Sequence, residues 1–409
     1  MKNTQLQRSG NAAVKKTASG EKVKIRIKKT EVNEYFMEAS ERARGAKWVC
    51  FVVLIAFLLV NLIFFREHIT YSNMLYLLRD LDTGTYAVSG EFAGAEYAEV
   101  TAASFELYKG KLAVSSNSGF TVYNSTGSTD VEENIYMKNP AVAAGEKYAV
   151  AYDMGGNTYS VYSTMGRVSG GTTENIIESC VVSDAGSFVI LSRSNEAEFV
   201  ATFYNTKLRA AMNYYRDAYV VAMAIDSKGE SLAMASAAIT NSGISTEIML
   251  ARTDSDATET VTVSNAMPLA MKYFGEKLLV FCDSKIAVFE GNQIVNEYSF
   301  ASGSPVSFDF SDRGLAVVCS ENAVGSSNAC YVFDDSGTLK TTFKVNEKVE
   351  SVALEETDCV YLLFDGRIEK REGENRTTSR TDGEILDMVP YYGKLIVCTR
   401  TSARITEFN

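Results

Sequence analysis

Most of this chain is predicted to fold as an all-β domain, on three observations. From Gly84 to Asn409, apolar runs of four to six residues alternate with clusters of Gly, Asn, Asp and Ser. This is the pattern of short strands joined by turns. No long helical period interrupts the pattern, and the whole chain has only four prolines. A turn followed by a short, strongly apolar segment also recurs eight times in this region.

The recurring segment predicts the architecture. The first apolar residues of its copies are Leu112, Tyr148, Phe188, Leu232, Leu278, Leu315, Val360 and Leu395. The intervals between copies are 35 to 46 residues, which matches the period of four-stranded propeller blades. A two-sheet sandwich does not explain such a period. The sequence therefore predicts a β-propeller over residues 84–409, with eight blades favoured and seven as the alternative.

Turn chemistry supports these repeats. In the turn Asp226–Gly229, the Asp carboxylate can accept hydrogen bonds from the backbone N–H groups that follow, and the glycine suits the return into the next strand. The last repeat begins at Ile385 and has room for about three strands. The stretch Gly84–Phe92 is predicted to supply the fourth strand and to close the ring, which removes open sheet edges.

The segment Trp48–Phe65 is predicted to be a single transmembrane helix. It contains no charged residue, and Asn61 is its one strongly polar residue. As a helix its 18 residues would span about 27 Å, close to the ~30 Å hydrocarbon core of a bilayer. A buried core helix would carry a polar face. A cleaved signal peptide would have a shorter leader and a small-residue cleavage site, so an uncleaved anchor fits better.

Charge predicts the orientation of this span. Residues 1–47 carry twelve Lys and Arg against five Asp and Glu, whereas residues 48–409 carry 28 against 46. Because basic segments favour the cytoplasmic side, residues 1–47 are expected to be a cytoplasmic tail and residues 66–409 to lie outside the cell membrane. The acidic outer domain would repel nucleic acid, so its charge is interpreted as an aid to solubility.

Shorter segments flank the predicted span. Residues 1–22 are polar and Lys-rich and are predicted to be disordered. Residues 23–28 alternate as a strand would, but their lysines suit anionic headgroups better. Residues 31–44 have an apolar helical face, which predicts either an interfacial helix or a docking face for a cytoplasmic partner, with a bend at Gly45. Residues 66–83 are predicted to form a helical stalk.

The cysteines are predicted to be free thiols. Cys50 lies in the span, and six others lie in the outer domain: Cys180, Cys282, Cys319, Cys330, Cys359 and Cys398. Most of the six stand in apolar runs, where cysteine behaves as a small buried hydrophobe. The pair Cys319 and Cys330 is the strongest candidate for an exception, because it spans one candidate hairpin.

The order of these features resembles a known family. A basic N-terminus, one signal-anchor helix, the leucine-rich link MLYLLRDLDTGTYAV and a propeller-like repeat region are similar to an uncharacterised family of bacterial membrane proteins from clostridial-type Firmicutes. The resemblance covers most of residues 20–409, and it implies a membrane-anchored propeller without an assigned activity or assigned site residues. The SDxG turns also resemble those of TolB-like and other propeller repeats.

Signatures of catalysis and of cofactor binding are missing from the sequence. The one histidine is His68, just past the span, so Ser-His-Asp catalysis and His-based zinc sites lack their residues in the outer domain. The one tryptophan, Trp48, lies at the membrane edge, and there is no phosphate-binding glycine loop. The turn Asp254–Asp256 falls short of a calcium loop. We therefore predict no catalytic residue, no cofactor-binding residue and no metal site.

Three functions follow as hypotheses. The leading one is a non-catalytic, membrane-tethered propeller whose loops bind a protein partner or a cell-envelope polymer. The second is a carboxylate-dependent hydrolase or lyase acting on cell-wall polysaccharide, which requires close carboxylates with raised pKa values at the central channel. The third is a transmembrane sensor that passes outer binding to residues 31–44.

Overall fold

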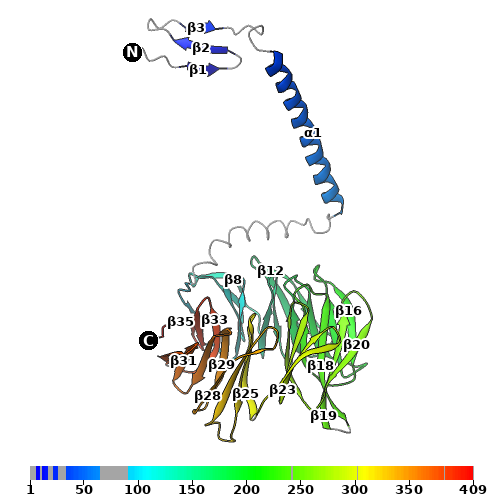
Figure 1. Ribbon diagram of the computed structural model, residues 1–409, viewed down its shortest axis with the longest axis vertical. Coiled ribbons are helices and arrows are strands. Elements are labelled where there is room, and N and C mark those ends of the chain that lie inside the picture. Colours follow the sequence, from blue (N-terminus) through cyan, green and yellow to red (C-terminus); the bar gives the residue numbers. More distant parts are fainter. Residues whose placement is uncertain are drawn as a thin grey trace. The chain divides into compact units, whose positions relative to one another are not determined.

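The computed structural model describes residues 6–9, 12–16, 22–25, 34–64, 91–240, 243–301, 303–381 and 383–408. The chain divides into two compact units, Met1–Leu77 and Leu78–Asn409, and each is described by itself. Figure 1 labels their elements along the chain.

The first unit holds a small sheet and one long helix. Strands β1 (Leu6–Ser9), β2 (Ala12–Lys16) and β3 (Lys22–Ile25) form an antiparallel sheet. The prediction that residues 1–22 are disordered is therefore wrong for these strands. Apolar and basic residues alternate along Lys22–Ile25, as they do in a strand. A single strand would not be stable by itself, but here three short strands pair with one another.

Helix α1 (Glu34–Phe64) runs without interruption through the predicted interfacial segment, Gly45 and most of the predicted span. The predicted bend at Gly45 is therefore wrong, because straight-chain and alanine residues on both sides of Gly45 carry the helix through it. Within the described residues, no helix combines the length and the apolar character that crossing a bilayer requires, so the predicted span is not supported by the structure. The predicted stalk at residues 66–83 lies outside the described residues.

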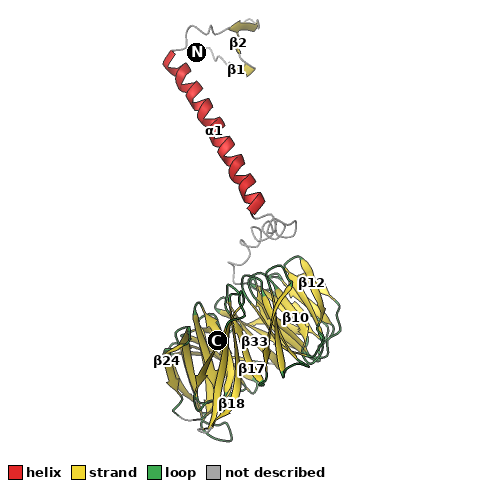
Figure 2. Ribbon diagram, turned by 90° about the vertical axis from the view of Figure 1, so that its right-hand side faces the viewer, coloured by secondary structure: helices red, strands yellow, loops and turns green. Residues whose placement is uncertain are grey.

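The second unit is an eight-bladed β-propeller, as predicted. Eight four-stranded antiparallel sheets follow one another around a ring, and Figure 2 shows them from the side. Blades 1 to 4 are β5 (Ala103–Tyr108), β6 (Lys111–Ser116), β7 (Gly119–Tyr123), β8 (Thr129–Glu133); β9 (Pro140–Ala144), β10 (Ala149–Asp153), β11 (Thr158–Ser163), β12 (Gly166–Thr172); β13 (Ile177–Val182), β14 (Phe188–Arg193), β15 (Phe199–Tyr204), β16 (Ala210–Arg216); and β17 (Val220–Ile225), β18 (Ser231–Thr240), β19 (Gly243–Arg252), β20 (Thr258–Val263).

Blades 5 to 8 continue the pattern. They are β21 (Pro268–Phe274), β22 (Lys277–Cys282), β23 (Lys285–Glu290), β24 (Gln293–Ser299); β25 (Ser304–Phe310), β26 (Gly314–Ser320), β27 (Asn328–Asp334), β28 (Leu339–Val345); β29 (Ser351–Glu356), β30 (Cys359–Phe364), β31 (Arg367–Glu372), β32 (Asn375–Arg380); and β33 (Ile385–Tyr391), β34 (Lys394–Thr399), β35 (Ser402–Thr406), β4 (Ala95–Glu96).

The recurring apolar segment of the sequence is the second strand of each blade. All of β30 is buried, and so is β26 except for its last residue. Each second strand packs on both faces because a blade lies between two neighbouring blades. For example, Ala233 and Val261 of blade 4 share one apolar cluster with Leu278 and Phe289 of blade 5. The recurrence in the sequence therefore reflects burial on both faces of the sheet.

The turn between β17 and β18 in blade 4 forms the hydrogen bonds that the sequence predicts. The Asp226 carboxylate accepts hydrogen bonds from the backbone N–H groups of Glu230 at 2.7 Å and Ser231 at 3.0 Å. These bonds hold the chain reversal between β17 and β18, as predicted for the turn Asp226–Gly229.

The ring is closed by a strand from the N-terminal side of the propeller. Strand β4 pairs with β35, where Ala95 lies opposite Ala403 and Glu96 lies opposite Ser402. Blade 8 thus takes three strands from the C-terminal end of the propeller and one from its N-terminal side, as predicted. The location predicted for this strand is wrong: Glu91 and Phe92 are not in a strand, and residues 84–90 lie outside the described residues. Phe92 instead packs its ring in the cluster that joins blades 8 and 1.

The cysteines follow the prediction. All seven are free, and the six in the propeller are buried. Cys330 lies opposite Val318, so Cys319, the next residue along β26, faces the other side of the blade. Cys319 packs towards blade 5 and Cys330 towards blade 7, and therefore the two thiols do not meet.

Candidate functional site

The first strand of each blade lines the centre of the ring, and the turns that follow these strands surround one mouth of the central channel. A cavity of about 500 Å³ opens there. It is lined mainly by the ends of β5, β25, β29 and β33 and by the turns after them. We call this site the channel mouth and define it by five of the charged residues that line it: Glu106, Lys272, Asp309, Asp312 and Asp387.

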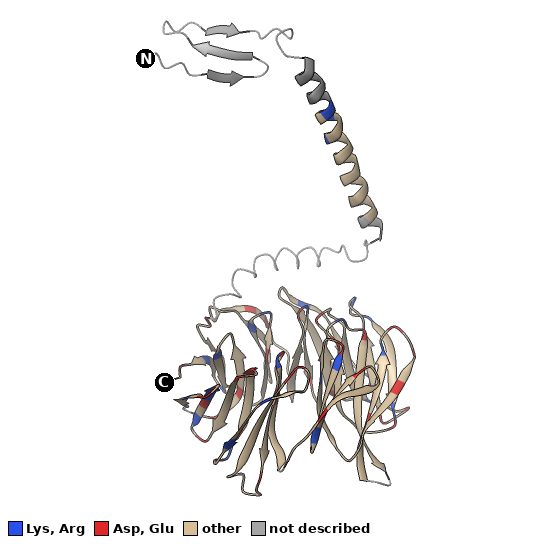
Figure 3. Ribbon diagram, in the orientation of Figure 1, with Lys and Arg blue, Asp and Glu red and all other residues tan. Residues whose placement is uncertain are grey.

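Three of these residues occupy equivalent places in different blades. Glu106 pairs with Ala113, Lys272 with Leu279 and Asp309 with Ala316. In each case the partner is the second residue of the recurring apolar segment. They therefore lie at the same level around the channel, in blades 1, 5 and 6. Figure 3 shows the charged residues on the propeller as a whole.

Hydrogen bonds hold the carboxylates in position. Asp309 Oδ2 accepts a hydrogen bond from the backbone N–H of Leu354 in the next blade, at 2.7 Å. Asp387 Oδ1 accepts one from the N–H of Met388 at 2.8 Å. Lys272 Nζ donates to Asp312 Oδ1 at 2.9 Å. Because the Asp309 bond joins blades 6 and 7, this carboxylate stabilises the ring as well as lining the cavity.

The electrostatics of the channel mouth favour the protonated forms of Glu106 and Asp387. Removal from bulk water raises the pKa of Glu106 to about 7; Lys272 opposes this rise, and Asp387, Asp309 and Asp312 add to it. The Glu106 side chain is nonetheless accessible from the channel, so the protein surrounds it without covering it. Desolvation also raises the pKa of Asp387 to about 6, while the Met388 N–H opposes the rise and Asp309 adds to it.

The two remaining carboxyl groups differ from each other. Burial raises the pKa of Asp309, and its hydrogen bond from Leu354 opposes that rise. The pKa of Asp312 is lowered by its ion pair with Lys272. The channel mouth therefore combines an ion pair with two carboxyl groups, Glu106 and Asp387, that change protonation near neutral pH. Such an arrangement is able to bind cationic or hydroxyl-bearing groups.

Stability is expected to fall as pH rises through the range in which these groups ionise. A carboxyl group whose pKa is higher in the folded state favours folding at low pH. For Glu106 this stabilisation of the folded state is fully present below about pH 4.3, which is the pKa of an unfolded glutamate. It is lost as the pH rises through about 7, the pKa of Glu106 in the folded protein. Melting temperature measured against pH should fall less steeply above pH ~5 for Glu106→Gln than for the wild type. A matched control is Glu259→Gln on the outer rim, and identical profiles for both variants would contradict the assignment.

The described residues contain no group of three or more His, Cys, Asp and Glu side chains arranged to hold a metal ion. The turn Asp254–Asp256 is a solvent-facing turn in which Arg252 pairs with Asp254 at 3.1 Å. Trp48 is exposed on α1, and His68 lies outside the described residues. The channel-mouth residues were missed from the sequence, although a signal was present: Glu106, Lys272 and Asp309 each stand six residues before the first apolar residue of a repeat.

Comparison with known proteins assigns the chain to a family. A model described as a family of unknown function (DUF5711) matches residues 85–408. The chain belongs to this family. Among curated proteins, no sequence matches it.

Solved structures similar to this DUF5711 propeller are distant in sequence. Hydrazine synthase of Kuenenia stuttgartiensis is 11% identical with a TM-score of 0.46, over 70% of this chain and 97% of that chain. The Cps50 (Swd1) β-propeller domain of Myceliophteria thermophila is 12% identical with a TM-score of 0.48, over 68% and 98%. The computationally designed Ika8 protein is 11% identical with a TM-score of 0.48, over 69% and 84%.

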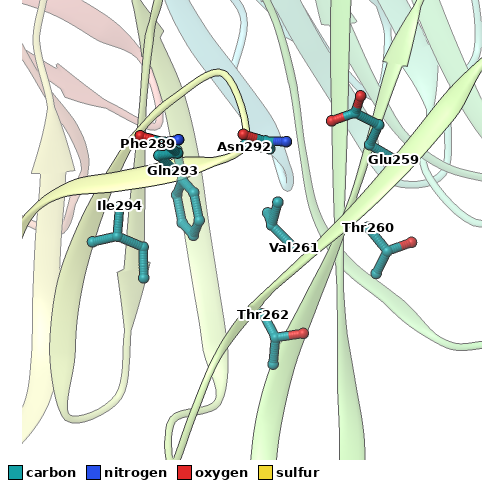
Figure 4. Close-up of a pocket in the computed structure, with 8 residues that line it drawn as sticks. All are labelled: Glu259, Thr260, Val261, Thr262, Phe289, Asn292, Gln293 and Ile294. Atoms are coloured by element: carbon teal, nitrogen blue, oxygen red, sulfur yellow. The ribbon is translucent and has the colours of Figure 1, made fainter.

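A second concave surface of the DUF5711 propeller lies on its outer rim, between blades 4 and 5. This groove has a volume of about 730 Å³. Figure 4 shows the residues that line it, which come from β20 and from β23, β24 and the turn between them. Buried Val261 and Phe289 contribute apolar surface, and the polar residues around them include one charged group, Glu259. The groove thus lacks the convergence of charged groups found at the channel mouth.

Proposed function

We propose that this protein is a membrane-tethered, non-catalytic propeller that lies outside the cell membrane and binds a protein partner or a cell-envelope polymer at the channel mouth. The observation that carries the proposal is the cavity of about 500 Å³ in which Glu106, Asp309 and Asp387 converge beside the Lys272–Asp312 ion pair. Such a cavity suits ligands that offer amino or hydroxyl groups, because carboxylates accept hydrogen bonds from both.

The tether is proposed from the sequence and from the surface of α1. The apolar side chains from Trp48 to Val60 that the structure describes, such as Phe51, Val53 and Phe57, are mostly more than half exposed. An uncovered apolar helix needs an apolar surrounding. The basic excess of residues 1–47 and the acidic excess of residues 48–409 favour a cytoplasmic N-terminus and an outer propeller.

Binding to purified envelope material tests the proposed site. Soluble cell-wall polysaccharide fragments and a lysine-rich peptide would be titrated into the full chain in detergent. We expect Glu106→Gln combined with Asp387→Asn to weaken binding of the preferred probe at least ~10-fold, because two charge-assisted hydrogen bonds are lost. Glu259→Gln on the outer rim should bind as the wild type does. Failure of the wild type to bind any probe, or equal losses in both variants, would count against the channel mouth.

A second candidate is a carboxylate-dependent hydrolase or lyase acting on cell-wall polysaccharide. It is favoured by the pKa values of about 7 for Glu106 and about 6 for Asp387, since a general acid needs a proton near neutral pH. Release of new reducing or unsaturated ends from wall polysaccharide would support it, provided that Glu106→Gln abolishes release without abolishing binding. A wild-type protein that binds polysaccharide and releases no product would leave the non-catalytic proposal in place.

A third candidate, a transmembrane sensor, is favoured by the continuity of α1 from Glu34 to Phe64, because an unbroken helix can transmit a displacement along its axis. Deletion of residues 1–44 should then abolish the response to an outer ligand while ligand binding remains. A response that persists after the deletion would exclude signalling through this segment.

A further inference from the structure

Carboxyl groups outnumber cations in the lining of the channel mouth. Eight Asp and Glu side chains line the cavity, against three Lys and Arg side chains. Two of the cations already have partners, since Lys272 pairs with Asp312 at 2.9 Å and Arg313 pairs with Glu356 at 3.3 Å. A positively charged ligand group is therefore complementary to this cavity. Beyond the five residues that define the channel mouth, its charged lining residues are Lys109, Glu146, Asp184, Arg313, Glu355 and Glu356.

Glu106 has no partner among the described residues. Its carboxylate accepts no hydrogen bond from them and forms no ion pair with them, although the side chain is accessible from the channel. Removal from bulk water raises the pKa of Glu106 to about 7. The ionised form of an unpaired carboxylate in such a place is stabilised by a cation that binds beside it. Glu106 is thus an acceptor that the protein itself leaves unfilled.

The chain's own ammonium group shows how a cation acts at this site. Lys272 is the main cause of the lowered pKa of Asp312, and it also opposes the rises that burial causes in the pKa values of Glu106 and Asp309. One ammonium does not compensate all the carboxyl groups, because the pKa of Glu106 is still about 7 and the pKa of Asp387 about 6. A second ammonium beside Glu106 and Asp387 would therefore be stabilised by two further carboxylates.

The carboxylates enter the channel from different blades and at two depths. Glu106 and Asp309 lie at one level, in blades 1 and 6. In blade 8 that level belongs to Val389, which pairs with Ile396, so Asp387 lies two residues deeper in the channel. An ammonium has three N–H donors that rotate on a slender stem, whereas the planar guanidinium of arginine fits two oxygens in one plane. Carboxylates that converge from several directions therefore suit lysine better than arginine.

Apolar side chains line the cavity beside these carboxylates. Leu107, Leu354 and Val389, from β5, β29 and β33, are among them. The four methylene groups of a lysine can cover such surface while the charged head reaches the carboxylates. A sugar ring would instead place hydroxyl groups against apolar side chains, which is unfavourable where no hydrogen bond replaces the lost water. The lining therefore favours an aliphatic cation over a polysaccharide.

We propose that the ligand of the channel mouth is a protein partner that inserts a lysine side chain, whose ammonium group is bound by Glu106, Asp309 and Asp387. The lysine-bearing partner deepens the function proposed above and depends on it. Asp309 and Asp387 each accept a backbone N–H, and a carboxylate has further acceptor sites for an ammonium. Because the ammonium favours the ionised carboxylates, each carboxylic acid that ionises on binding releases one proton to the solvent.

Calorimetric titration of the full chain in detergent tests the choice of lysine. Three peptides would be used that differ at one position, which carries lysine, arginine or acetyl-lysine, and that contain no other titratable side chain. At about pH 8 we expect the arginine and acetyl-lysine peptides to bind at least ~10-fold more weakly than the lysine peptide. An arginine peptide that binds as tightly as the lysine peptide, or an acetyl-lysine peptide that does so, would overturn the proposal.

The pH dependence of the same titration tests the role of the carboxylates. A lysine keeps its charge up to about pH 10, so a change in affinity at lower pH reports on the protein. We expect the affinity of the wild type for the lysine peptide to rise at least ~5-fold from about pH 5.5 to about pH 8. Glu106→Gln should lose most of this rise, and Glu259→Gln on the outer rim should keep it. Equal affinities of the wild type at the two pH values would contradict binding by Glu106 and Asp387.

Cell-wall polysaccharide fragments distinguish failure of this proposal from failure of the proposed function. Fragments that bind the wild type, but not Glu106→Gln combined with Asp387→Asn, would keep the channel mouth as the binding site. If no lysine peptide binds in that case, the lysine-bearing partner is excluded and the proposed function stands. If neither probe binds the wild type, or if Glu259→Gln loses binding equally, both proposals fail.

Discussion

Replacement of Gly127 by alanine is expected to destabilise the propeller by about 2–5 kcal/mol, because this glycine lies where the ring is closed. Its φ is +76°, and an added Cβ would overlap with the carbonyl oxygen of Gly94. Gly94 directly precedes β4, the strand that completes blade 8, and the N–H of Ala93 donates to the carbonyl oxygen of Ser125 at 2.8 Å. A side chain at Gly127 would therefore displace the segment that joins the two ends of the ring.

Gly366→Ala is the matched control for this variant. Gly366 has a φ of +72°, but an added Cβ would meet no atom within 4 Å. Gly366→Ala should lower the free energy of unfolding by only about 1–2 kcal/mol, which is the cost of holding an alanine at a positive φ. Urea unfolding of the full chain, followed by circular dichroism, measures both losses. Equal losses would show that contact with Gly94 does not contribute and that ring closure does not depend on this turn.

Glu369→Leu is expected to lower the free energy of unfolding by about 3–5 kcal/mol, because it leaves a buried arginine without its partner. Glu369 and Arg371 lie in β31 and are 9% and 7% exposed, with Arg371 Nε 2.5 Å from Glu369 Oε1. The Arg371 guanidinium also lies 4.1 Å from the centre of the Phe343 ring. Removal of the carboxylate would leave a positive charge enclosed between blades, where water cannot solvate it.

The double variant Glu369→Leu with Arg371→Met distinguishes the effect of an unpaired buried charge from the effect of altered packing. It should recover most of the lost stability, because two apolar side chains of similar volume can replace a buried pair at little cost. Glu384→Leu is the control: its pair with Arg400 at 2.8 Å is exposed to solvent and should contribute little to the free energy of unfolding. Unfolding free energies of all variants would be compared, and a double variant as unstable as Glu369→Leu would argue against an unpaired charge as the cause.

The propeller could be predicted from the sequence because its main signal is local. The second strand of each blade is buried on both faces, so it appears as an apolar run, and eight such runs in succession indicate eight blades. The helix at residues 34–64 was predicted as two segments with a bend. A glycine lowers helix stability only by about 1 kcal/mol, and residues on both sides of Gly45 favour the helix.

The sequence correctly predicted that a strand from before the first repeat closes the ring, but it placed this strand at the wrong residues. The count of strands in the last repeat shows that one is missing, and this is a property of the sequence. Which residues fill the gap depends on where the incoming chain meets β35, and therefore on the register of Ala95 opposite Ala403. That register is determined by packing of Phe92 and of its neighbours between blades 8 and 1.

The sequence by itself predicted the fold class, favoured eight blades over seven and predicted that most of the propeller cysteines are buried, because each follows from apolar periodicity along consecutive residues. Only the tertiary structure decided that Glu106, Lys272, Asp309 and Asp387 surround one cavity, since they come from blades 1, 5, 6 and 8. Ring closure brings these distant positions together, and their removal from bulk water raises the pKa of Glu106 to about 7. The clustering of charged residues at the channel mouth is thus a property of the closed ring. It cannot be read from any run of consecutive residues in the sequence.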